Sequence, residues 1–240
     1  MIRIYEEDLA KSAWTPSPEA QKHLKVLRVK PGETVELFNG KGLLRRYTVQ
    51  CGGTFTAAGE CLAVEKPRRD IVLFACITKG SRWDWTIEKA VEIGATKIVP
   101  LISERTIVRL DAAERPAKLE RWRRIALDAA RQSDAAWLPD IVSAVDFKDF
   151  KSHIAGLDVY AGALLKPRPE PFLDALLQSG SEASGIGVFI GPEGDFTEEE
   201  MSALLANGVK PVDFGPTVLR AETAAVYALS VAAAAVYRRG

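Results

Sequence analysis

The stretch GVFIGPEGDFTEEE, residues 187–200, indicates which class of fold the chain adopts. It begins with four residues that are apolar or glycine, as is typical of a strand buried on both faces of a sheet. A polar loop with two glycines and a proline follows directly, and Thr197 with Glu200 has the spacing of a helix capping box. In open α/β sheets, ligands bind beyond the carboxyl ends of the strands. The stretch therefore predicts an α/β fold with a candidate ligand loop at residues 191–195.

The same alternation of strand and helix begins at Ile71 and continues to the end of the chain. Apolar runs and helical spacing predict strands over 71–77, 97–102, 158–161, 186–190 and 211–214, and helices over 82–94, 113–133, 197–206 and 221–237. Alternation at these lengths is typical of an α/β domain with a mostly parallel sheet.

Residues before the break at Lys66–Asp70 follow a different pattern. One helix is predicted over 18–27, whereas short strands are predicted near Arg3 and over 33–38, 43–50 and 60–65. Asn39-Gly40 separates two of these strands and is a strong hairpin signal. We therefore expect a small β-barrel-like domain over residues 1–68, followed by the α/β domain over 70–240.

Composition and charge exclude several classes of protein. Of the 240 residues, 47% are apolar, and 32 Lys and Arg balance 32 Asp and Glu. This neutrality argues against a strongly basic nucleic-acid binder of the histone kind. The balance is uneven, because residues 1–70 hold 12 basic and 9 acidic side chains. A mild preference for an anionic partner is therefore expected in the first domain.

Motifs for metal, phosphate and disulfide chemistry are missing from the sequence. The three cysteines, Cys51, Cys61 and Cys76, have no zinc-ligand spacing and are expected to be reduced thiols. The only histidines are His23 and His153, so no metal site is expected, and no nucleotide-binding P-loop is present. No run of residues has the length of a membrane span, and the first ten residues do not resemble a signal peptide. We expect a cytoplasmic protein without a membrane partner.

A second stretch, FGPTVLRAETAA at residues 214–225, repeats the arrangement of the first. A short strand meets a Gly-Pro pair, and Arg220, Glu222 and Thr223 then lead into an alanine-rich helix. Glu222 and Thr223 could serve only as helix caps. Two glycine–proline loops at neighbouring strand ends would, however, form one crevice. The acidic residues at 193, 195 and 198–200 would repel a phosphate but would tolerate a cation or a ligand with hydroxyl groups.

Together, IGPEGDF and FGPTVLRAETAA resemble the C-terminal signature of the SPOUT-class RNA methyltransferases. The chain is most similar to the family that methylates N3 of a uridine in 16S ribosomal RNA of the small subunit. HLKVLRVKPGETVELFNGKG (23–42), KGSRWDWTIEKAVEIGATKIVPL (79–101) and RWRRIALDAARQS (121–133) agree with that family in order and position. The resemblance implies a PUA-like barrel, a trefoil-knotted α/β domain, S-adenosyl-L-methionine as cofactor and a homodimer.

The resemblance also implies roles for particular residues. The cofactor would be bound by Leu164, Leu165, Ile190, Gly191, Pro192, Glu193, Gly194, Phe214, Gly215, Val218, Leu219, Thr223 and Ala224. Arg220 would stabilise the uracil anion or a flanking phosphate, and Glu222 would either orient Arg220 or accept the N3 proton. RNA phosphates would be contacted by Arg3, Lys25, Arg28, Lys41, Arg45, Arg46, Lys79 and Arg82.

Departures from the family pattern fall at two places. Asp195 stands where the family usually has a second glycine, and the segment Asp134–Leu138 lacks two arginines that the family usually carries. Two alternatives therefore stay open: a related methyltransferase that acts on another RNA, and a non-catalytic RNA-binding or assembly protein. The eight alanines of the last helix are compatible with a dimer interface or with ordinary core packing.

Overall fold

The computed structural model describes residues 1–179 and 183–237, and its contacts divide into two compact units. The first consists of Met1–Lys66 with Ala130–Leu138, and the second of Pro67–Ala129 with Pro139–Gly240. The first unit thus includes residues 130–138, which were expected in the second domain. Among the described residues, no helix is long and apolar enough to cross a membrane.

The first unit is built around a six-stranded sheet with one helix. Its elements are β1 (Ile2–Tyr5), β2 (Ala13–Trp14), α1 (Pro18–Val26), β3 (Thr34–Phe38), β4 (Leu43–Val49), β5 (Phe55–Ala57) and β6 (Leu62–Ala63). The strand order is β1-β3-β4-β5-β2, and β6 pairs with β4. Alternate residues of these strands bury a compact core that includes Ile4, Trp14, Val35, Leu37, Tyr47 and Phe55. The two short strands β2 and β5 were not predicted from the sequence.

The predicted hairpin is present between β3 and β4, which pair antiparallel. Its loop spans residues 39–42 and is therefore longer than a two-residue turn. Within it, Oδ1 of Asn39 accepts hydrogen bonds from the backbone N–H groups of Lys41 (2.8 Å) and Leu43 (3.0 Å). Gly40 and Gly42 have φ angles of 67° and 87°, a conformation that glycine adopts without strain.

Residues 136–138 are hydrogen-bonded to this hairpin loop. The N–H of Leu138 donates to the carbonyl of Gly40 (2.9 Å), and the N–H of Gly42 donates to the carbonyl of Ala136 (3.0 Å). A Cβ atom on Gly42 would lie 2.5 Å from the ring of Trp137, so no larger residue fits there. The segment Asp134–Leu138 therefore packs against the β3–β4 hairpin loop within the first unit, through backbone hydrogen bonds and the Trp137 ring.

Arg3 joins the same segment to the sheet. Its Nε donates to Glu36 Oε1 (3.1 Å), and its Nη1 donates to the carbonyls of Ala130 (2.9 Å) and Ala135 (3.1 Å). The guanidinium also lies 4.6 Å from the centre of the Phe38 ring. Arg3 is only 3% exposed. The expectation that it contacts RNA phosphates is therefore wrong, because its side chain is used inside the unit.

The second unit contains one parallel sheet covered by helices. Its strands are β7 (Asp70–Cys76), β8 (Lys97–Ile102), β9 (Asp140–Ile141), β10 (Val145–Asp146), β11 (Leu157–Gly162), β12 (Gly185–Ile190) and β13 (Lys210–Val212). Its helices are α2 (Ser81–Ile93), α3 (Arg115–Gln132, whose last turn belongs to the first unit), η1 (Phe147–His153), α4 (Phe172–Gln178), α5 (Glu198–Ala206) and α6 (Ala221–Val236). The five predicted strands and four predicted helices are all present, whereas β9, β10, η1 and α4 were missed.

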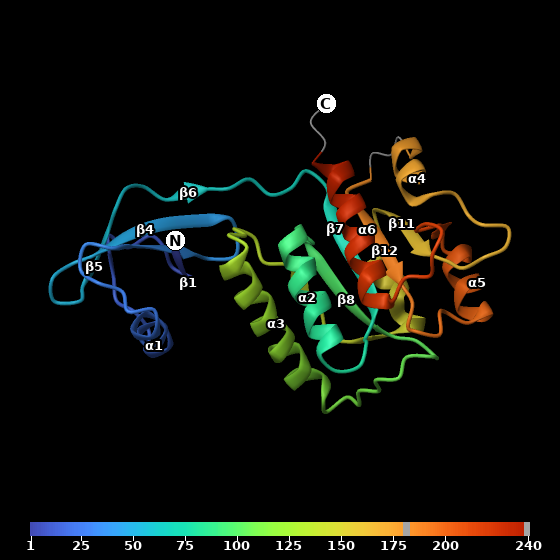
Figure 1. Cartoon of the computed structure of the whole chain (residues 1–240), viewed down its shortest axis with the longest axis horizontal. Helices are drawn as coiled ribbons and strands as arrows, with labels where there is room; N and C mark the ends of the chain where they lie inside the picture. The colour runs from blue at the N-terminus through green and yellow to red at the C-terminus, as the bar shows by residue number, and fades with distance from the viewer. Residues whose placement is uncertain (180–182, 238–240) are drawn as a thin grey trace. The chain divides into compact units, whose positions relative to one another are not determined.

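Both faces of this sheet are buried. On one face Val72, Phe74 and Cys76 pack with side chains of η1 and α5, such as Phe150 and Leu204. On the other face lie α2 and α6, which Figure 1 shows side by side in front of β7, β8 and β12. Six of the eight alanines of α6 are buried within the single chain, so core packing accounts for most of them.

The burial of Arg3 predicts a large effect on stability. Replacement by methionine would leave Glu36 poorly paired and two carbonyls without a donor, so we expect Arg3→Met to lower the free energy of unfolding by about 3 kcal/mol. Arg46 also pairs with Glu36, but its side chain is 58% exposed, and Arg46→Met should cost no more than about 0.5 kcal/mol. Urea unfolding of the two variants measures the difference, and equal losses would contradict this account of Arg3.

Candidate functional site

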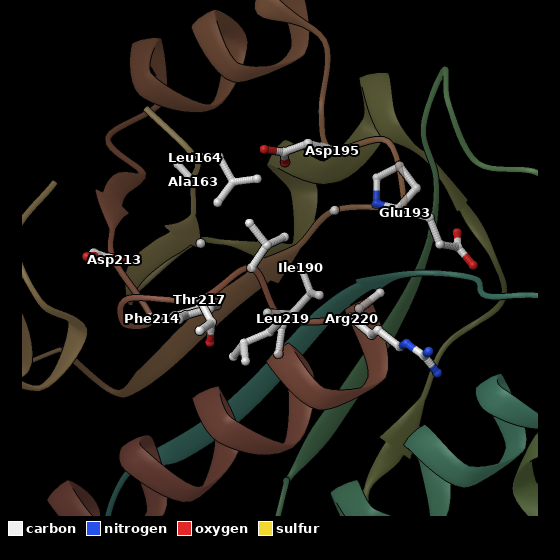
Figure 2. Close-up of a pocket in the computed structure, with 16 residues that line it drawn as sticks. Ala163, Leu164, Ile190, Glu193, Asp195, Asp213, Phe214, Thr217, Leu219 and Arg220 are labelled. Carbon is white, nitrogen blue, oxygen red and sulfur yellow. The ribbon is translucent and has the colours of Figure 1, made fainter. Parts of the chain in front are cut away.

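A pocket lies where three neighbouring strands of the second unit end. β11 pairs in parallel with both β12 and β13, so the carboxyl ends of the three strands meet at one edge of the sheet. The cavity has a volume of about 270 Å³. Figure 2 shows its lining, which is made of Gly162, Ala163, Leu164, Ile190, Gly191, Pro192, Glu193, Asp195, Asp213, Phe214, Thr217, Val218, Leu219, Arg220, Ala221 and Ala224.

The loop after β12 forms one wall, and Glu200 holds its far end. The capping box that the sequence predicts is present: the Glu200 N–H donates to Thr197 Oγ1 (3.1 Å), and the Thr197 N–H donates to Glu200 Oε2 (3.0 Å). The second oxygen, Oε1, accepts from the N–H of Glu104 at 2.8 Å. This buried carboxylate therefore ties the start of α5 to the loop that follows β8.

Arg105, from the loop after β8, holds the middle of the same wall. Its Nη1 donates to the carbonyl of Gly194 at 2.7 Å, with a longer contact of 3.5 Å to the carbonyl of Phe196. A Cβ atom on Gly194 would come within 3.3 Å of Arg105 Cδ. Gly194 thus allows the arginine to lie close against the loop.

The loop after β13 forms the opposite wall, and Arg168 holds it in a similar way. Nη1 of Arg168 donates to the Gly215 carbonyl (3.2 Å), and Nη2 donates to the Pro216 carbonyl (3.1 Å). The Phe214 ring lies over Gly162, where a Cβ atom would come within 2.3 Å of it. Two arginines that were not predicted therefore each hold the backbone of one wall.

The charged groups of the pocket are mostly acidic. Glu193, Asp195 and Asp213 line it, and Arg220 is the one basic side chain among the lining residues. Glu193 forms an ion pair with Arg82 (3.2 Å) in which both side chains are partly exposed. In Figure 2, Arg220 and Glu193 lie on one side of the pocket, and Asp213 and Phe214 lie on the other. The pocket thus suits a ligand that is largely apolar, carries hydroxyl groups and has no phosphate.

Family models match both parts of the chain. An RNA methyltransferase domain matches residues 64–233, and an RNA methyltransferase PUA domain matches residues 17–50. The chain belongs to this RNA methyltransferase family. The N-terminal part of the methyltransferase is thus PUA-like, as the resemblance implied.

Similar proteins cover most of its length. Ribosomal RNA small subunit methyltransferase E of Synechocystis is 32% identical over 88% of this chain and 70% of its own. A solved structure described as ribosomal RNA small subunit methyltransferase E from Neisseria gonorrhoeae, bound to S-adenosyl methionine, is 30% identical over 96% of each chain, with a TM-score of 0.78. A Legionella pneumophila methyltransferase structure with bound cofactor SAM is 30% identical over 98% of this chain and 97% of its own, with a TM-score of 0.84.

The predicted cofactor residues do not all line the pocket of this methyltransferase. The cavity brings together Leu164, Ile190, Gly191, Pro192, Glu193, Phe214, Val218, Leu219 and Ala224, with Arg220 from the predicted catalytic pair. Leu165, Gly194, Gly215, Glu222 and Thr223 are not among the lining residues. Gly194 and Gly215 instead present the carbonyls that Arg105 and Arg168 hold. One carboxylate oxygen of Glu222 is buried without a hydrogen-bond partner among the described residues.

Several lining or supporting residues were missed by sequence reasoning. Gly162, Asp213 and Thr217 line the pocket, and Arg105 and Arg168 support it. Asp213 directly follows β13, and Arg105 lies a few residues beyond the end of β8. Ligand-site residues of α/β folds are found at such strand ends. This position was the available signal for these two residues. Nothing in the sequence around Arg168 indicates that its guanidinium would contact the loop after β13.

The predicted RNA-contacting residues divide into exposed and internally bonded groups. Lys25, Arg28, Lys41, Arg46, Lys79 and Arg82 are exposed. Arg45 differs, because its Nη1 donates to three backbone carbonyls, those of Leu9, Ala10 and Lys11. One nitrogen of its guanidinium is therefore bonded within the first unit, and its contact with an RNA phosphate stays a prediction.

No cysteine or histidine is among the residues that line the pocket. Cys51, Cys61 and Cys76 are free thiols. Burial raises the pKa of Cys76 to about 11, so this thiol stays protonated at neutral pH. No group of metal-binding side chains occurs among the described residues.

Asp195, which stands where the family usually has glycine, adopts the left-handed conformation that glycine favours. Its φ is 59°, and its Oδ1 accepts a hydrogen bond from the N–H of Phe196 at 2.8 Å. A Cβ atom on Gly191 would lie 3.0 Å from the same oxygen. Aspartate tolerates this conformation better than most residues, and its local hydrogen bond offsets part of the strain.

Two substitutions at Asp195 separate strain from hydrogen bonding. Asp195→Gly removes both the strain and the hydrogen bond, so we expect a change in the free energy of unfolding within about 0.5 kcal/mol. Asp195→Ala keeps the strain and loses the hydrogen bond, and should destabilise the protein by about 1–2 kcal/mol. Urea unfolding compares the two, and an alanine variant as stable as the glycine variant would refute the assignment.

Proposed function

We propose that the protein uses S-adenosyl-L-methionine to methylate N3 of a uridine in 16S ribosomal RNA of the small subunit. The observation that carries this proposal is that the loops after β12 and β13 line the same pocket, with Arg220 among its lining residues. The family membership and the cofactor-bound relatives support the reaction class. A cytoplasmic location would follow from this substrate.

The lining of the pocket fits the proposed cofactor. Apolar side chains of Leu164, Ile190 and Leu219 would contact the adenine ring. Carboxylates of Glu193, Asp195 and Asp213 offer acceptors for ribose hydroxyls and favour a cation over a phosphate. When bound, the cofactor supplies an electrophilic methyl group on a sulfonium cation.

Arg220 lines the pocket, and we propose that it assists the reacting base. N3 of uracil is a poor nucleophile while it is protonated, so the site must stabilise the anion that remains when the proton leaves. The guanidinium of Arg220 is permanently charged and presents a fork of donors. We assign it the stabilisation of this anion or of a flanking phosphate. Extrusion of the target base from its stack would bring it to the pocket.

Glu222 follows Arg220 in the first turn of α6. A proton acceptor must contact the base, and Glu222 is not among the lining residues of the pocket. We therefore propose that Glu222 supports the start of α6 and the charge of Arg220, since a carboxylate is favourable at a helix N-terminus.

RNA would be held by the exposed cations of both units. Lys25, Arg28, Lys41 and Arg46 in the first unit, and Lys79 and Arg82 in the second, are available for phosphate contacts. Arg82 would exchange its ion pair with Glu193 for a phosphate when RNA binds.

We also propose a homodimer and a knotted chain at the pocket. Leu164 and Val218 are 64% and 74% exposed beside the cavity, which supports coverage by a second copy. The loops after β12 and β13, two strands that lie on either side of β11, line one pocket, an arrangement that agrees with the trefoil knot that the family resemblance implies.

Two measurements test the function as a whole. Isothermal titration of the purified protein with S-adenosyl-L-methionine should give one binding event per chain. Mass spectrometry of 16S RNA from strains with and without the gene should show one methyluridine that depends on the gene. Modification of a different RNA would favour the related methyltransferase, and RNA binding without cofactor binding would favour the assembly protein.

Removal of the Arg220 guanidinium tests its catalytic role. We expect Arg220→Ala to reduce single-turnover methylation by about 10²–10³-fold, as for loss of one anion-stabilising donor, with cofactor affinity changed much less. Arg220→Lys keeps the charge but loses the fork, and should restore only part of the rate. A rate that is unaffected in Arg220→Ala would exclude the role.

The two arginines that hold the walls should control cofactor affinity. Loss of their hydrogen bonds frees the wall carbonyls, so we expect Arg105→Ala and Arg168→Ala each to weaken cofactor binding about tenfold. Arg123→Ala serves as the control, because Glu120, on the surface of α3, is the one ion-pair partner of Arg123 among the described residues. Calorimetry measures the dissociation constants, and unchanged values for both wall variants would contradict the proposed support.

A further inference from the structure

The end of α1 and the turn after it carry a dense group of exposed cations. Lys22, Lys25, Arg28 and Lys30 are all exposed, and we call these four residues, with Val26 and Leu27, the α1 corner. Among the described residues, no carboxylate forms an ion pair with any of the four cations. Two acids, Glu19 and Glu33, occur in the same stretch, and four cations against two acids leave it net positive.

Arg28 occupies the position at which a helix usually ends in glycine. The N–H of Val29 donates to the carbonyl of Leu24 (3.2 Å), and the N–H of Arg28 donates to the carbonyl of Lys25 (3.1 Å). This pair of hydrogen bonds is the Schellman motif, in which the residue in the place of Arg28 is left-handed and is most often glycine. Arg28 has a φ of 54°, so its backbone is strained in a way that glycine would avoid.

No polar contact of the Arg28 side chain within the described part of the chain offsets this strain. The side chain forms no hydrogen bond or ion pair among the described residues, and it is exposed. Backbone strain of this kind is found more often at functional sites than elsewhere. The exposed guanidinium is therefore a candidate for such a function.

Apolar side chains lie between the cations. Val26 is 71% exposed and Leu27 is 42% exposed. The α1 corner has no Phe, Tyr or Trp on which a base could stack, and stacking on aromatic rings is how proteins usually read single-stranded RNA. Cations with small apolar side chains suit a sugar–phosphate backbone, which offers negative charge and ribose carbons without sequence information.

We propose that the α1 corner is an anchor that binds the RNA sugar–phosphate backbone independently of its sequence, and that Arg28 is its central contact. The left-handed backbone of Arg28 makes the fold less stable than glycine would at this position. This inference rests on the proposed function for the identity of the ligand as RNA. It adds Lys22, Lys30, Val26 and Leu27 to the RNA surface and assigns the corner to nucleotides other than the target uridine.

Opposite effects on stability and on RNA binding test the anchor. The full chain is titrated with a short RNA hairpin of arbitrary sequence over a series of salt concentrations. Arg28→Gly should weaken binding about 3- to 10-fold at low salt and lower the slope of log K against log salt by about one, as for loss of one phosphate contact. The same variant should raise the urea midpoint, because glycine relieves the strain. Its affinity for S-adenosyl-L-methionine should be unchanged.

Two control variants separate the position from its charge. Arg28→Asn also tolerates the left-handed conformation but carries no charge, so it should lose the same RNA affinity. Lys151→Gln removes one exposed positive charge from η1 in the second unit and should leave the salt slope unchanged.

Each outcome bears on the anchor. Wild-type affinity and slope in Arg28→Gly, or an equal loss in Lys151→Gln, would overturn it, even if cofactor binding and methylation are intact. Equal competition by polyglutamate would overturn the choice of RNA in favour of an acidic protein partner. A wild-type chain that binds neither RNA nor the cofactor would instead overturn the proposed function itself.

Discussion

The pairing of β11 between β12 and β13 is the constraint on which the site depends. Parallel pairing places the carboxyl ends of the three strands at one edge of the sheet, although α4 and α5 separate them in the chain. Residues as far apart as Gly162 and Ala224 thereby line one cavity. The close packing of Phe214 on Gly162 shows how little space this arrangement leaves at the base of the pocket.

The walls of that cavity are loops, and they are held by charged groups from other loops. Glu200 uses one oxygen to cap its own helix and the other to bind the N–H of Glu104. Arg105 and Arg168 donate to carbonyls on opposite walls. Backbone carbonyls are fixed acceptors, so an arginine that contacts them restricts the loop without occupying the pocket. The lining itself is then free to be apolar and acidic.

Much of the fold could be predicted from the sequence, whereas the supports of the site could not. Apolar runs such as 97–102 were read correctly, because burial on both faces of a sheet leaves a local pattern. The loop 191–195 and the stretch 214–225 were recognised because glycine and proline follow a predicted strand in each. Arg105 and Arg168 act on carbonyls about 47 to 90 positions away in the chain, and no local pattern records such a contact. Arg3 and Arg45 were placed on the surface because arginine usually lies there, but both donate to backbone carbonyls inside the first unit.

The membership of residues 130–138 in the first unit has a consequence for how the chain becomes folded. The polypeptide passes between the two units three times, after Lys66, after Ala129 and after Leu138. During synthesis, the N-terminal sheet can form early. Its hairpin loop and Arg3, however, complete their contacts only with residues 130–138, which are made after more than half of the chain. Cutting the gene at residue 66 would therefore yield a barrel with its last contacts missing, and the two units are better regarded as interleaved than as modules that could be exchanged.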